Sequence, residues 1–452
     1  METMPTIVAL STPAGSGALG VIRLSGPDAV AIANAVFKGK DLTKQATHTL
    51  HFGLIMDQET VLDEVVVSLF LAPKSYTKEN VVEISCHGSS YIIQRIISLL
   101  IEKGARAAKP GEFTLQAFLN GAFDLSKAEA VADLIASNSK ASHDIAMQQM
   151  RGGFADELQG LREQLIHFAS MIELELDFAE EDVEFANRDQ LKELVLQINR
   201  VIARLVQSFE LGNVIKNGIP IVIAGKPNVG KSTLLNALLN EDRAIVSDIA
   251  GTTRDTIEDE INIGGLVFRF IDTAGIRETA DLIEAKGVER TLEKMKQAKL
   301  ILYMADATQS FEEIESQLES LKRQDIPYLF FVNKAELLDT AQKKALKGLN
   351  GQFITAKEQV GVEALKDSLL ETVNLKNINT NETILTNIRH VEALKHTEEA
   401  LNRVLMNVDN PITSDFLAMD IKQALHYLGE IVGEVTTDDL LENIFSKFCI
   451  GK

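Results

Sequence analysis

The sequence predicts a multidomain α/β and α protein with an N-terminal α+β domain, a helical domain, and a P-loop α/β domain inserted into the helical one. Three patterns support this prediction. Strand and helix patterns alternate over the first part of the chain, and a strand, a glycine loop and a helix follow one another near its middle. Helical spacing of apolar residues flanks that middle part on both sides. We expect the domains to cover residues 1–118, residues 119–212 with 378–452, and residues 213–377.

The first domain is predicted from short runs that are rich in Val, Ile and Leu. Strands are expected at residues 6–11, 20–25, 47–56, 65–71 and 81–85, and helices at 28–37 and 90–103. The glycines of segment 12–20 (TPAGSGALG) could belong to a nucleotide loop or to a turn. Their spacing fits neither common phosphate-binding pattern, so a turn between two strands is favoured.

Long helices are predicted on both sides of the middle part. Apolar residues recur every three or four positions over residues 158–176 and 191–209, and again from residue 389 to the end. Such stripes are typical of the core of a helical domain. An acidic cluster at residues 180–184 lies between the first two helices. It could bind a metal, although a solvated loop is the favoured interpretation.

The middle part begins with a phosphate-binding pattern. Residues 225–232 (GKPNVGKS) match G-x-x-x-x-G-K-[ST], between an apolar run at 221–224 and leucines at helical spacing over 234–239. The glycines allow backbone N–H groups to converge on a phosphate, and the following helix N-terminus adds positive potential. Lys231 is expected to reach the β- and γ-phosphates, and the Ser232 hydroxyl to bind Mg²⁺.

Further motifs follow in the order that resembles GTPases. Residues 251–255 (GTTRD) lie where a switch segment belongs, and residues 272–275 (DTAG) supply a carboxylate and a glycine for the γ-phosphate. Residues 333–336 (NKAE) and 355–357 (TAK) resemble the guanine-binding NKxD and SAK motifs. Glu336 replaces the usual Asp, so the carboxylate is retained but is one methylene longer. The GTP-binding residues expected from this resemblance are Asn228, Val229, Gly230, Lys231, Ser232, Thr233, Ser247, Asp248, Ile249, Ala250, Gly251, Thr252, Thr253, Asp272, Thr273, Ala274, Gly275, Asn333, Lys334, Glu336, Thr355, Ala356 and Lys357.

Composition restricts the class of protein. For 452 residues, a prior of roughly 150 residues per domain gives about three domains. The formal net charge of −20 is opposite to that of nucleic-acid-binding domains, so contact with RNA must be local or depend on a partner. The two cysteines, Cys86 and Cys449, exclude a disulfide framework and fit a reducing cytosol. Neither a signal peptide nor a run of about 18 apolar residues occurs, which predicts a soluble cytoplasmic protein with no membrane segment.

Three separate segments resemble the MnmE (TrmE) family of tRNA uridine-5-carboxymethylaminomethyl modification GTPases. They are residues 109–120 (KPGEFTLQAFLN), 124–135 (DLSKAEAVADLI) and 445–452 (FSKFCIGK). Together with the inserted GTPase-like domain they follow the family's order, and the resemblance covers essentially the full length. A prenylation box is the alternative for the C-terminal residues, but a terminal Lys fits it poorly.

The resemblance implies that the N-terminal domain dimerises and binds a one-carbon donor of the 5-formyl-tetrahydrofolate type. The implied folate-binding residues are Arg23, Glu83, Ala122 and Lys452, the last brought in by the chain end. Ala122 stands where the family often has a Lys, which removes one cationic contact. Without the resemblance, an ion pair between two strands is the simpler interpretation of Arg23 and Glu83. Cys449 is the implied catalytic thiol, although its apolar surroundings suit a packed thiol equally.

GTP hydrolysis requires a water-positioning group that the usual position lacks. Ras-like enzymes use a Gln after DxxG, whereas Ile276 stands there and cannot form side-chain hydrogen bonds. By resemblance, Glu284 is the catalytic residue that orients the water, and a K⁺ ion supplies positive charge. Thr253 is expected to bind Mg²⁺ together with Ser232. The implied K⁺ ligands are Asn228, Ser247, Ile249 and Thr252.

These expectations describe a K⁺-stimulated GTPase that adds an aminomethyl or carboxymethylaminomethyl group to C5 of the wobble uridine of certain tRNAs. We expect a homodimer that acts with an FAD-dependent partner in a heterotetramer or larger complex, and a partner that contributes much of the tRNA affinity. A regulatory ribosome-assembly GTPase is the alternative, although such a protein would normally carry a basic RNA-binding appendage. A stand-alone folate-dependent one-carbon transferase is a third hypothesis.

Overall fold

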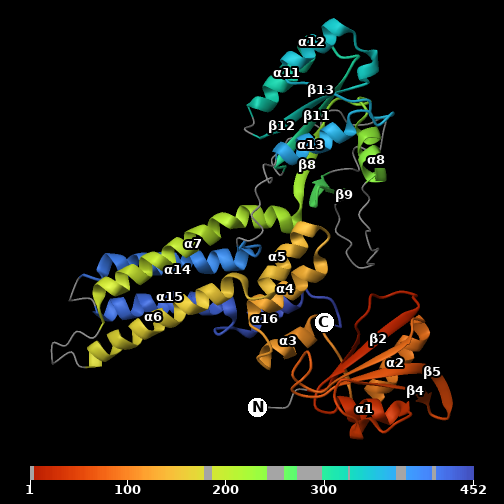
Figure 1. The fold of residues 1–452 in the computed structure, drawn as a ribbon, viewed down its shortest axis with the longest axis vertical. Coiled ribbons are helices and arrows are strands. Elements are labelled where there is room, and N and C mark those ends of the chain that lie inside the picture. The colour runs from red at the N-terminus through yellow and green to blue at the C-terminus, as the bar shows by residue number, and fades with distance from the viewer. Residues whose placement is uncertain are drawn as a thin grey trace.

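The fold consists of a helical part that connects two sheets. The computed structural model describes residues 5–177, 186–241, 259–271, 298–323, 326–372, 383–409 and 414–451. Figure 1 shows the helices between an N-terminal sheet, coloured red and orange, and a second sheet in green and cyan. The chain leaves the helical part, forms the second sheet and returns to the helices. The predicted fold class, with an α/β part inserted into a helical part, is therefore confirmed.

The N-terminal part is a mixed seven-stranded sheet covered on one face by helices. Its elements are β1 Ile7–Leu10, β2 Leu19–Ser25, α1 Ala29–Val36, β3 Phe37–Lys38, η1 Leu42–Lys44, β4 Thr49–Asp57, β5 Thr60–Phe70, β6 Val81–His87, α2 Ser90–Glu102 and β7 Arg106–Ala107. The strand order is β3-β4-β5-β6-β2-β1-β7, and each neighbouring pair is antiparallel except β1 with β7. Alternate strand residues share one core with α1 and α2. β1 and β2 pair antiparallel, which confirms the turn predicted between them.

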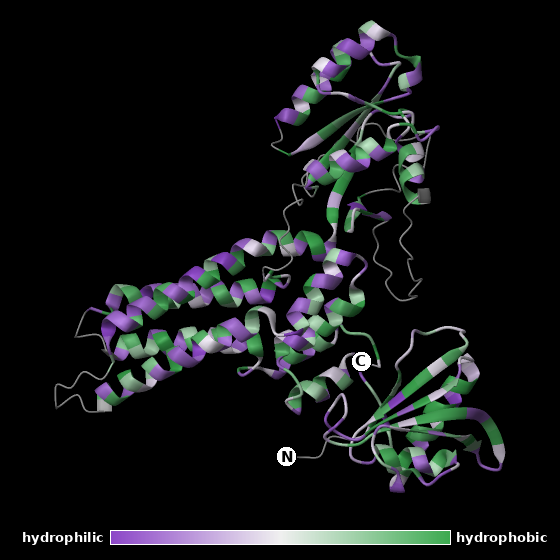
Figure 2. Cartoon of the chain, in the orientation of Figure 1, coloured by the Kyte–Doolittle hydropathy of each residue, from purple (hydrophilic) through white to green (hydrophobic). Residues whose placement is uncertain are grey.

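The helical part is built from segments on both sides of the insertion. Its helices are α3 Glu112–Leu119, α4 Leu125–Ala136, α5 Lys140–Met150, α6 Gly153–Asp177, α7 Arg188–Asn217, α14 Ile388–Asn407, α15 Ser414–Val432 and α16 Asp438–Phe445. Leu165 and Ile198, before the insertion, belong to the same core as Leu401 and Ile421, after it. Apolar and polar residues alternate along these helices in Figure 2, as the predicted stripes require. Among the residues described, no helix is both long and apolar enough to cross a bilayer.

The inserted part is a second, largely parallel sheet with helices on both faces. Its elements are β8 Ile219–Ala224, α8 Lys231–Glu241, β9 Asp259–Ile263, β10 Leu266–Phe270, β11 Leu300–Asp306, α11 Phe311–Lys322, β12 Tyr328–Asn333, η3 Ala335–Leu337, α12 Thr340–Gly348, β13 Gln352–Phe353 and α13 Val362–Thr372. The order is β13-β12-β11-β8-β10-β9, with the described pairs parallel except β9 with β10. Leu302 and Met304 face the core shared with α8 and α13, whereas Ile301 and Tyr303 face α11 and α12. β11 is consequently buried along its whole length.

A buried polar cluster joins the two halves of the helical part. Glu129 of α4 accepts hydrogen bonds from Asn387 Nδ2 (2.9 Å) and from Arg389 Nε and Nη2 (3.0 and 2.9 Å). Its Oε2 also lies 2.7 Å from His390 Nε2. Burial opposes ionisation of Glu129, but the contacts with His390 and Arg389 outweigh it and lower the pKa to about 2. Arg389 donates in turn to the carbonyl oxygen of Glu430, so the cluster fixes α4 against α14 and α15.

Candidate functional site

The phosphate-binding pattern folds as a tight loop between β8 and α8, so the predicted strand, loop and helix are confirmed. Gly225 has a φ of 145° and Gly230 a φ of 102°, values that other residues rarely adopt. A Cβ atom at Gly225 would lie 2.2 Å from the carbonyl oxygen of Met304, and one at Gly230 would lie 2.1 Å from Asn333 Nδ2. Both positions therefore require glycine, because β11 and β12 approach the loop closely.

Lys231 begins α8 and turns back over the loop. Its Nζ donates to the carbonyl oxygens of Gly225 (2.7 Å) and Lys226 (2.8 Å), and burial lowers its pKa. An ammonium group held at this position can exchange these carbonyl partners for phosphate oxygens. Ser232 and Thr233 follow in the first turn of α8, which places both at the helix end that faces the loop.

Asn333 connects the loop to the predicted guanine-binding segments. It is the last residue of β12 and is 5% exposed. Its Nδ2 donates to the carbonyl oxygen of Val229 (2.8 Å), and its Oδ1 accepts from the backbone N–H of Ala356 (3.0 Å). One buried side chain thus joins three segments: the phosphate loop, the end of β12 and residues 355–357. The sequence analysis predicted each of them from a separate motif. Because both ends of the amide are bonded, these segments are fixed relative to one another.

Lys334 adopts a left-handed backbone conformation, with a φ of 58°, and lies along the same wall. Its Nζ donates to Asp306 Oδ2 (2.6 Å) and to the carbonyl oxygen of Asn228 (3.3 Å). Burial opposes ionisation of Asp306, but hydrogen bonds from Lys334 and Thr308 outweigh it and lower the pKa of Asp306. The sequence analysis missed Asp306. A polar residue at the carboxyl end of a buried parallel strand was the available signal.

Glu336 lies in η3 with its side chain exposed beside the TAK segment. Its Oε2 accepts a hydrogen bond from Thr355 Oγ1 (2.8 Å). Hydrogen bonds from its own backbone and from Thr355 lower the pKa of Glu336, which favours the carboxylate form. The longer side chain therefore still has a defined neighbour, whereas Lys357 at the end of the segment is exposed.

Several predicted site residues lie outside the described part of the chain. Their roles stay predictions, as does the interpretation of the acidic cluster at 180–184. These residues are Ser247, Asp248, Ile249, Ala250, Gly251, Thr252, Thr253, Asp272, Thr273, Ala274, Gly275, Ile276, Glu284 and Lys452.

The N-terminal sheet carries a second cluster of predicted residues. Arg23 of β2 and Glu83 of β6 are cross-strand neighbours, with Arg23 Nε and Nη2 at 2.9 and 2.8 Å from Glu83 Oε1. The guanidinium lies over the rings of Tyr76 and Phe113, at 5.6 and 5.8 Å from their centroids. Its Nη1 also donates to the carbonyl oxygen of Gly451 (3.4 Å). The structure thus brings the described C-terminal residues to the Arg23–Glu83 pair.

Two further predicted residues, Cys449 and Ala122, lie on segments that contact the N-terminal part of the chain. The side chain of Cys449 is exposed, so the described structure does not support a packed thiol. Its carbonyl oxygen accepts a hydrogen bond from the N–H of Gly111 (3.3 Å). Ala122 is half-buried in the turn after α3. Lys78 Nζ donates to the neighbouring carbonyl of Gly121, so a cation does lie at this turn.

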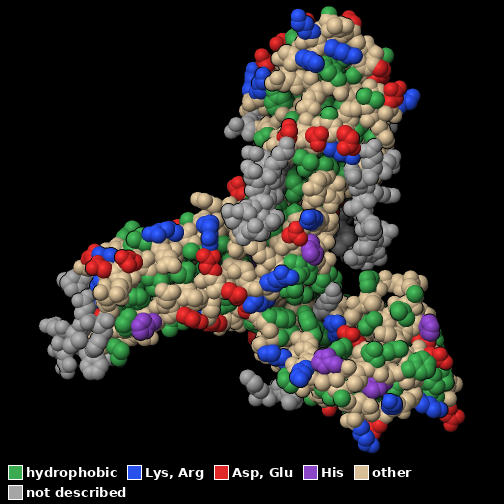
Figure 3. Space-filling view, in the orientation of Figure 1, with side chains coloured by type: hydrophobic (Ala, Val, Ile, Leu, Met, Phe, Trp, Pro, Cys, Tyr) green, Lys and Arg blue, Asp and Glu red, His purple; other side chains and the backbone are tan. Residues whose placement is uncertain are grey.

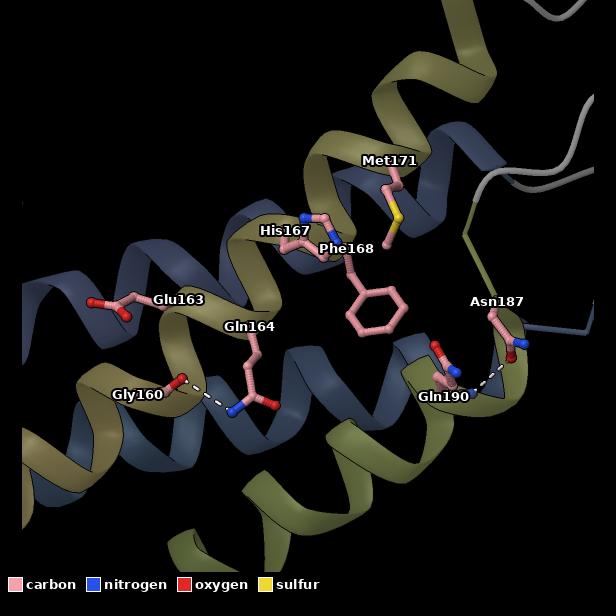
Figure 4. A pocket seen from close by; sticks show the side chains of 8 residues that line it. All are labelled: Gly160, Glu163, Gln164, His167, Phe168, Met171, Asn187 and Gln190. Atoms are coloured by element: carbon pink, nitrogen blue, oxygen red, sulfur yellow. Dashed lines mark hydrogen bonds between the residues drawn. The ribbon is translucent and has the colours of Figure 1, made fainter.

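A groove of about 620 Å³ lies between α6 and α7, remote from both clusters. Figure 4 shows Phe168 and Met171 on one side of the groove, with Gln190 on the other. Gln164 Nε2 donates to the carbonyl oxygen of Gly160 (3.3 Å) at its edge. None of the predicted site residues that the structure describes lines this groove.

Two family descriptions match the chain, each over a different part. Residues 6–122 match the family described as the GTP-binding protein TrmE N-terminus. Residues 125–449 match the family described as the MnmE helical domain.

Curated relatives are similar over the whole chain. The tRNA modification GTPase MnmE of Cytophaga hutchinsonii is 59% identical over 449 residues, covering 99% of this chain and 98% of that protein. The tRNA modification GTPase MnmE of Christiangramia forsetii is 56% identical over 474 residues, covering 100% of both. Among solved structures, Aquifex aeolicus Era bound to GDP.AlF4⁻ is 28% identical, covering 40% of this chain and 66% of that one. The TM-score of this match is 0.26.

Proposed function

This chain belongs to the MnmE family of tRNA modification GTPases, and on that basis we propose that it hydrolyses GTP in order to modify tRNA. The modification is the addition of an aminomethyl or carboxymethylaminomethyl group to C5 of the wobble uridine, and it takes place in the cytoplasm. The observation that carries the proposal is the Asn333 side chain, which joins the phosphate loop to both guanine-binding segments.

The positions of the described residues support a separate role for each in GTP binding. The loop N–H groups and Lys231 bind the phosphates, because the loop and the start of α8 converge there. The carboxylate of Glu336 accepts hydrogen bonds from guanine that adenine cannot supply. The Ser232 hydroxyl is a suitable hard ligand at the same end of α8. With Thr253 it would hold Mg²⁺, which neutralises phosphate charge when bound.

Hydrolysis is proposed to be stimulated by K⁺ and to use Glu284 for orienting water. Asn228 is exposed at the loop with a φ of 63°, and its carbonyl oxygen is bonded to Lys334, so its side-chain oxygen can serve the ion. Ser247, Ile249 and Thr252 are the other proposed ligands. Turnover should fall about 10²-fold when K⁺ is replaced by Na⁺ at equal ionic strength. Asn228→Ala should lower the rate in K⁺ to the rate in Na⁺, and equal wild-type rates in both salts would contradict the ion's role.

The one-carbon chemistry is proposed to occur at the Arg23–Glu83 pair. A paired carboxylate and guanidinium beside two aromatic rings suits a flat polar heterocycle such as a pteridine. Lys78 near Ala122 and the chain-end residue Lys452 would bind the acidic tail of the folate. Cys449 is exposed two positions before Gly451, whose carbonyl oxygen accepts a hydrogen bond from Arg23, and is the proposed catalytic thiol.

A homodimer is proposed to act with an FAD-dependent partner in a heterotetramer or larger complex. The net charge of −20 supports a partner that contributes tRNA affinity. On the face shown in Figure 3, Lys and Arg side chains are scattered among acidic ones rather than gathered in one patch. A cationic surface on the partner would complement this distribution.

Analysis of tRNA nucleosides by mass spectrometry tests the proposal. A strain that lacks this chain should lose the modified wobble uridine, and the wild-type gene should restore it. Lys231→Ala, which removes the phosphate-binding ammonium, should fail to restore it. A regulatory role in ribosome assembly predicts instead unchanged tRNA nucleosides and an altered ratio of ribosomal subunits, and that result would overturn the proposal.

A further inference from the structure

We propose that Ser11 and Gly451 are positioning residues that clamp the C-terminal tail, residues 446–451, so that Cys449 stays beside the Arg23–Glu83 pair. The clamp rests on the proposed function, because it assigns a purpose to the tail in the modification reaction. Neither residue is assigned to the nucleotide site or to the folate-binding residues.

Two carbonyl oxygens of the tail are bound by the N-terminal part of the chain. Ser11 Oγ donates to the carbonyl oxygen of Gly451 (3.1 Å), which also accepts from Arg23 Nη1 (3.4 Å). The N–H of Gly111 donates to the carbonyl oxygen of Cys449 (3.3 Å). Ser11 is itself fixed, because its own N–H donates to the carbonyl oxygen of Val21 in β2 (2.8 Å). The tail backbone is therefore held at both Cys449 and Gly451.

Gly451 fits its place only as a glycine. It is buried, and its φ of 91° is a conformation that favours glycine. A Cβ atom there would lie 2.1 Å from the carbonyl oxygen of Leu10, which is a backbone atom of β1 and cannot move aside. The close contact with Leu10 and the hydrogen bonds to the Gly451 carbonyl therefore fix the tail backbone in the same position.

The other end of the tail is held by apolar packing. Phe445 of α16 and Phe448 pack with Leu115 and Phe118 of α3 in one small core. Cys449 lies between this core and the Ser11–Gly451 contact, with its thiol exposed. A reactive group on a backbone fixed at both sides is held near its working geometry before substrate arrives.

Tail mobility can be measured directly with a nitroxide spin label on Cys449. Cys86 is 1% exposed, and burial raises its pKa to about 11, so it should not compete for the reagent. We expect a motionally restricted spectrum for the wild type and a mobile component in Ser11→Ala and Gly451→Ala. Ser11→Thr retains the hydroxyl and should restore the restricted spectrum. Ser446→Ala is the matched control, because the one hydrogen bond that its hydroxyl makes in the described structure goes to the carbonyl oxygen of Asn443 in the preceding helix α16.

The catalytic consequence is measured with unlabelled protein, its partner and tRNA. Loss of one hydrogen bond should lower kcat of uridine modification roughly two- to tenfold in Ser11→Ala, with a larger loss in Gly451→Ala. KM for tRNA, GTP hydrolysis and the melting temperature should not change, and Ser11→Thr should recover kcat.

The outcomes separate the clamp from the proposed function. Identical spectra for wild type and Ser11→Ala would overturn the clamp alone. A mobile label with unchanged kcat would overturn the positioning role and leave the function standing. If the complete wild-type system makes no modified uridine, the proposed function fails, and the clamp's catalytic purpose fails with it.

Discussion

The side-chain amide of Asn333 lies 2.8 Å from the carbonyl oxygen of Val229, across 104 positions of sequence. This bond joins the carboxyl end of β12 to the phosphate loop after β8. The same side chain also accepts a hydrogen bond from the N–H of Ala356, so one residue contacts both the loop and the predicted guanine-binding segment at 355–357. We therefore expect loop geometry and base recognition to be coupled through this buried hydrogen-bonded side chain.

The first prediction concerns this coupling. Asn333→Ala leaves the Val229 carbonyl and the Ala356 N–H without their partner in a buried site, which costs about 1–3 kcal/mol. GTP affinity should fall roughly tenfold to a hundredfold, as measured by titration with a fluorescent nucleotide. Asn199→Ala in α7 removes an amide far from the loop and should leave the affinity unchanged. Wild-type affinity in Asn333→Ala would show that the loop holds its shape without this side chain.

The second prediction concerns Glu336. Glu336→Gln keeps the size of the side chain but removes the negative charge that would accept guanine N–H groups. Hydrogen bonds to a charged group are worth about 1.5–3 kcal/mol, so GTP affinity should fall by roughly tenfold or more while the weaker affinity for ATP changes little. Competition binding measures both. Equal losses for the two nucleotides would mean that Glu336 supports the fold of η3 rather than base selection.

The sequence alone predicted those features that depend on residues close together in the chain. The loop between β8 and α8 was predictable because glycine spacing, an apolar strand and helical leucines lie within about twenty positions. The order of the later motifs also indicated a nucleotide site. Helical spacing over 158–176 and 191–209 likewise predicted α6 and α7, since amphipathic periodicity is a local signal.

Contacts between residues far apart in the chain could not be predicted from local sequence patterns. Asp306 contacts Lys334 only because β11 and β12 are neighbours in the sheet. The order of strands in a sheet cannot be predicted from the hydrophobic pattern of each strand. Glu129 and Arg389 are 260 positions apart, so no spacing rule connects them. The approach of the chain end to Arg23 was expected from the family resemblance, whereas the bond from Ser11 to Gly451 was not.

The third prediction concerns the Glu129 cluster. Glu129→Gln leaves Arg389 without its buried counter-charge, so the free energy of unfolding of the helical part should fall by roughly 3–5 kcal/mol at pH 7. The folded-state pKa of Glu129 is depressed to about 2 from 4.5. Its ionised form therefore stabilises the fold above pH 4.5, and this contribution is lost as the pH falls from there toward about 2.

Urea unfolding of wild type and variant at several pH values measures both effects. The difference between the two proteins should be largest at neutral pH and should narrow below pH 4.5. Glu193→Gln removes an exposed carboxylate of α7 and should change stability by less than about 0.5 kcal/mol. If the difference in unfolding free energy does not depend on pH, then Glu129 stabilises the fold through its shape and not through its charge.

The last prediction concerns the tail as a whole. Deletion of residues 449–452 should abolish uridine modification and leave GTP hydrolysis close to the wild-type rate. The described residues of the predicted nucleotide site lie between Gly225 and Lys357. The tail contacts Ser11, Arg23 and Gly111 instead. Phosphate release and nucleoside mass spectrometry on the same preparation measure the two activities.

Cys449→Ala keeps both carbonyl anchors, so comparison with the deletion separates loss of the thiol from loss of the clamp. Normal modification by the truncated protein would exclude the tail from the active site, whereas an equal fall in GTP hydrolysis would show that the tail also acts on the nucleotide domain.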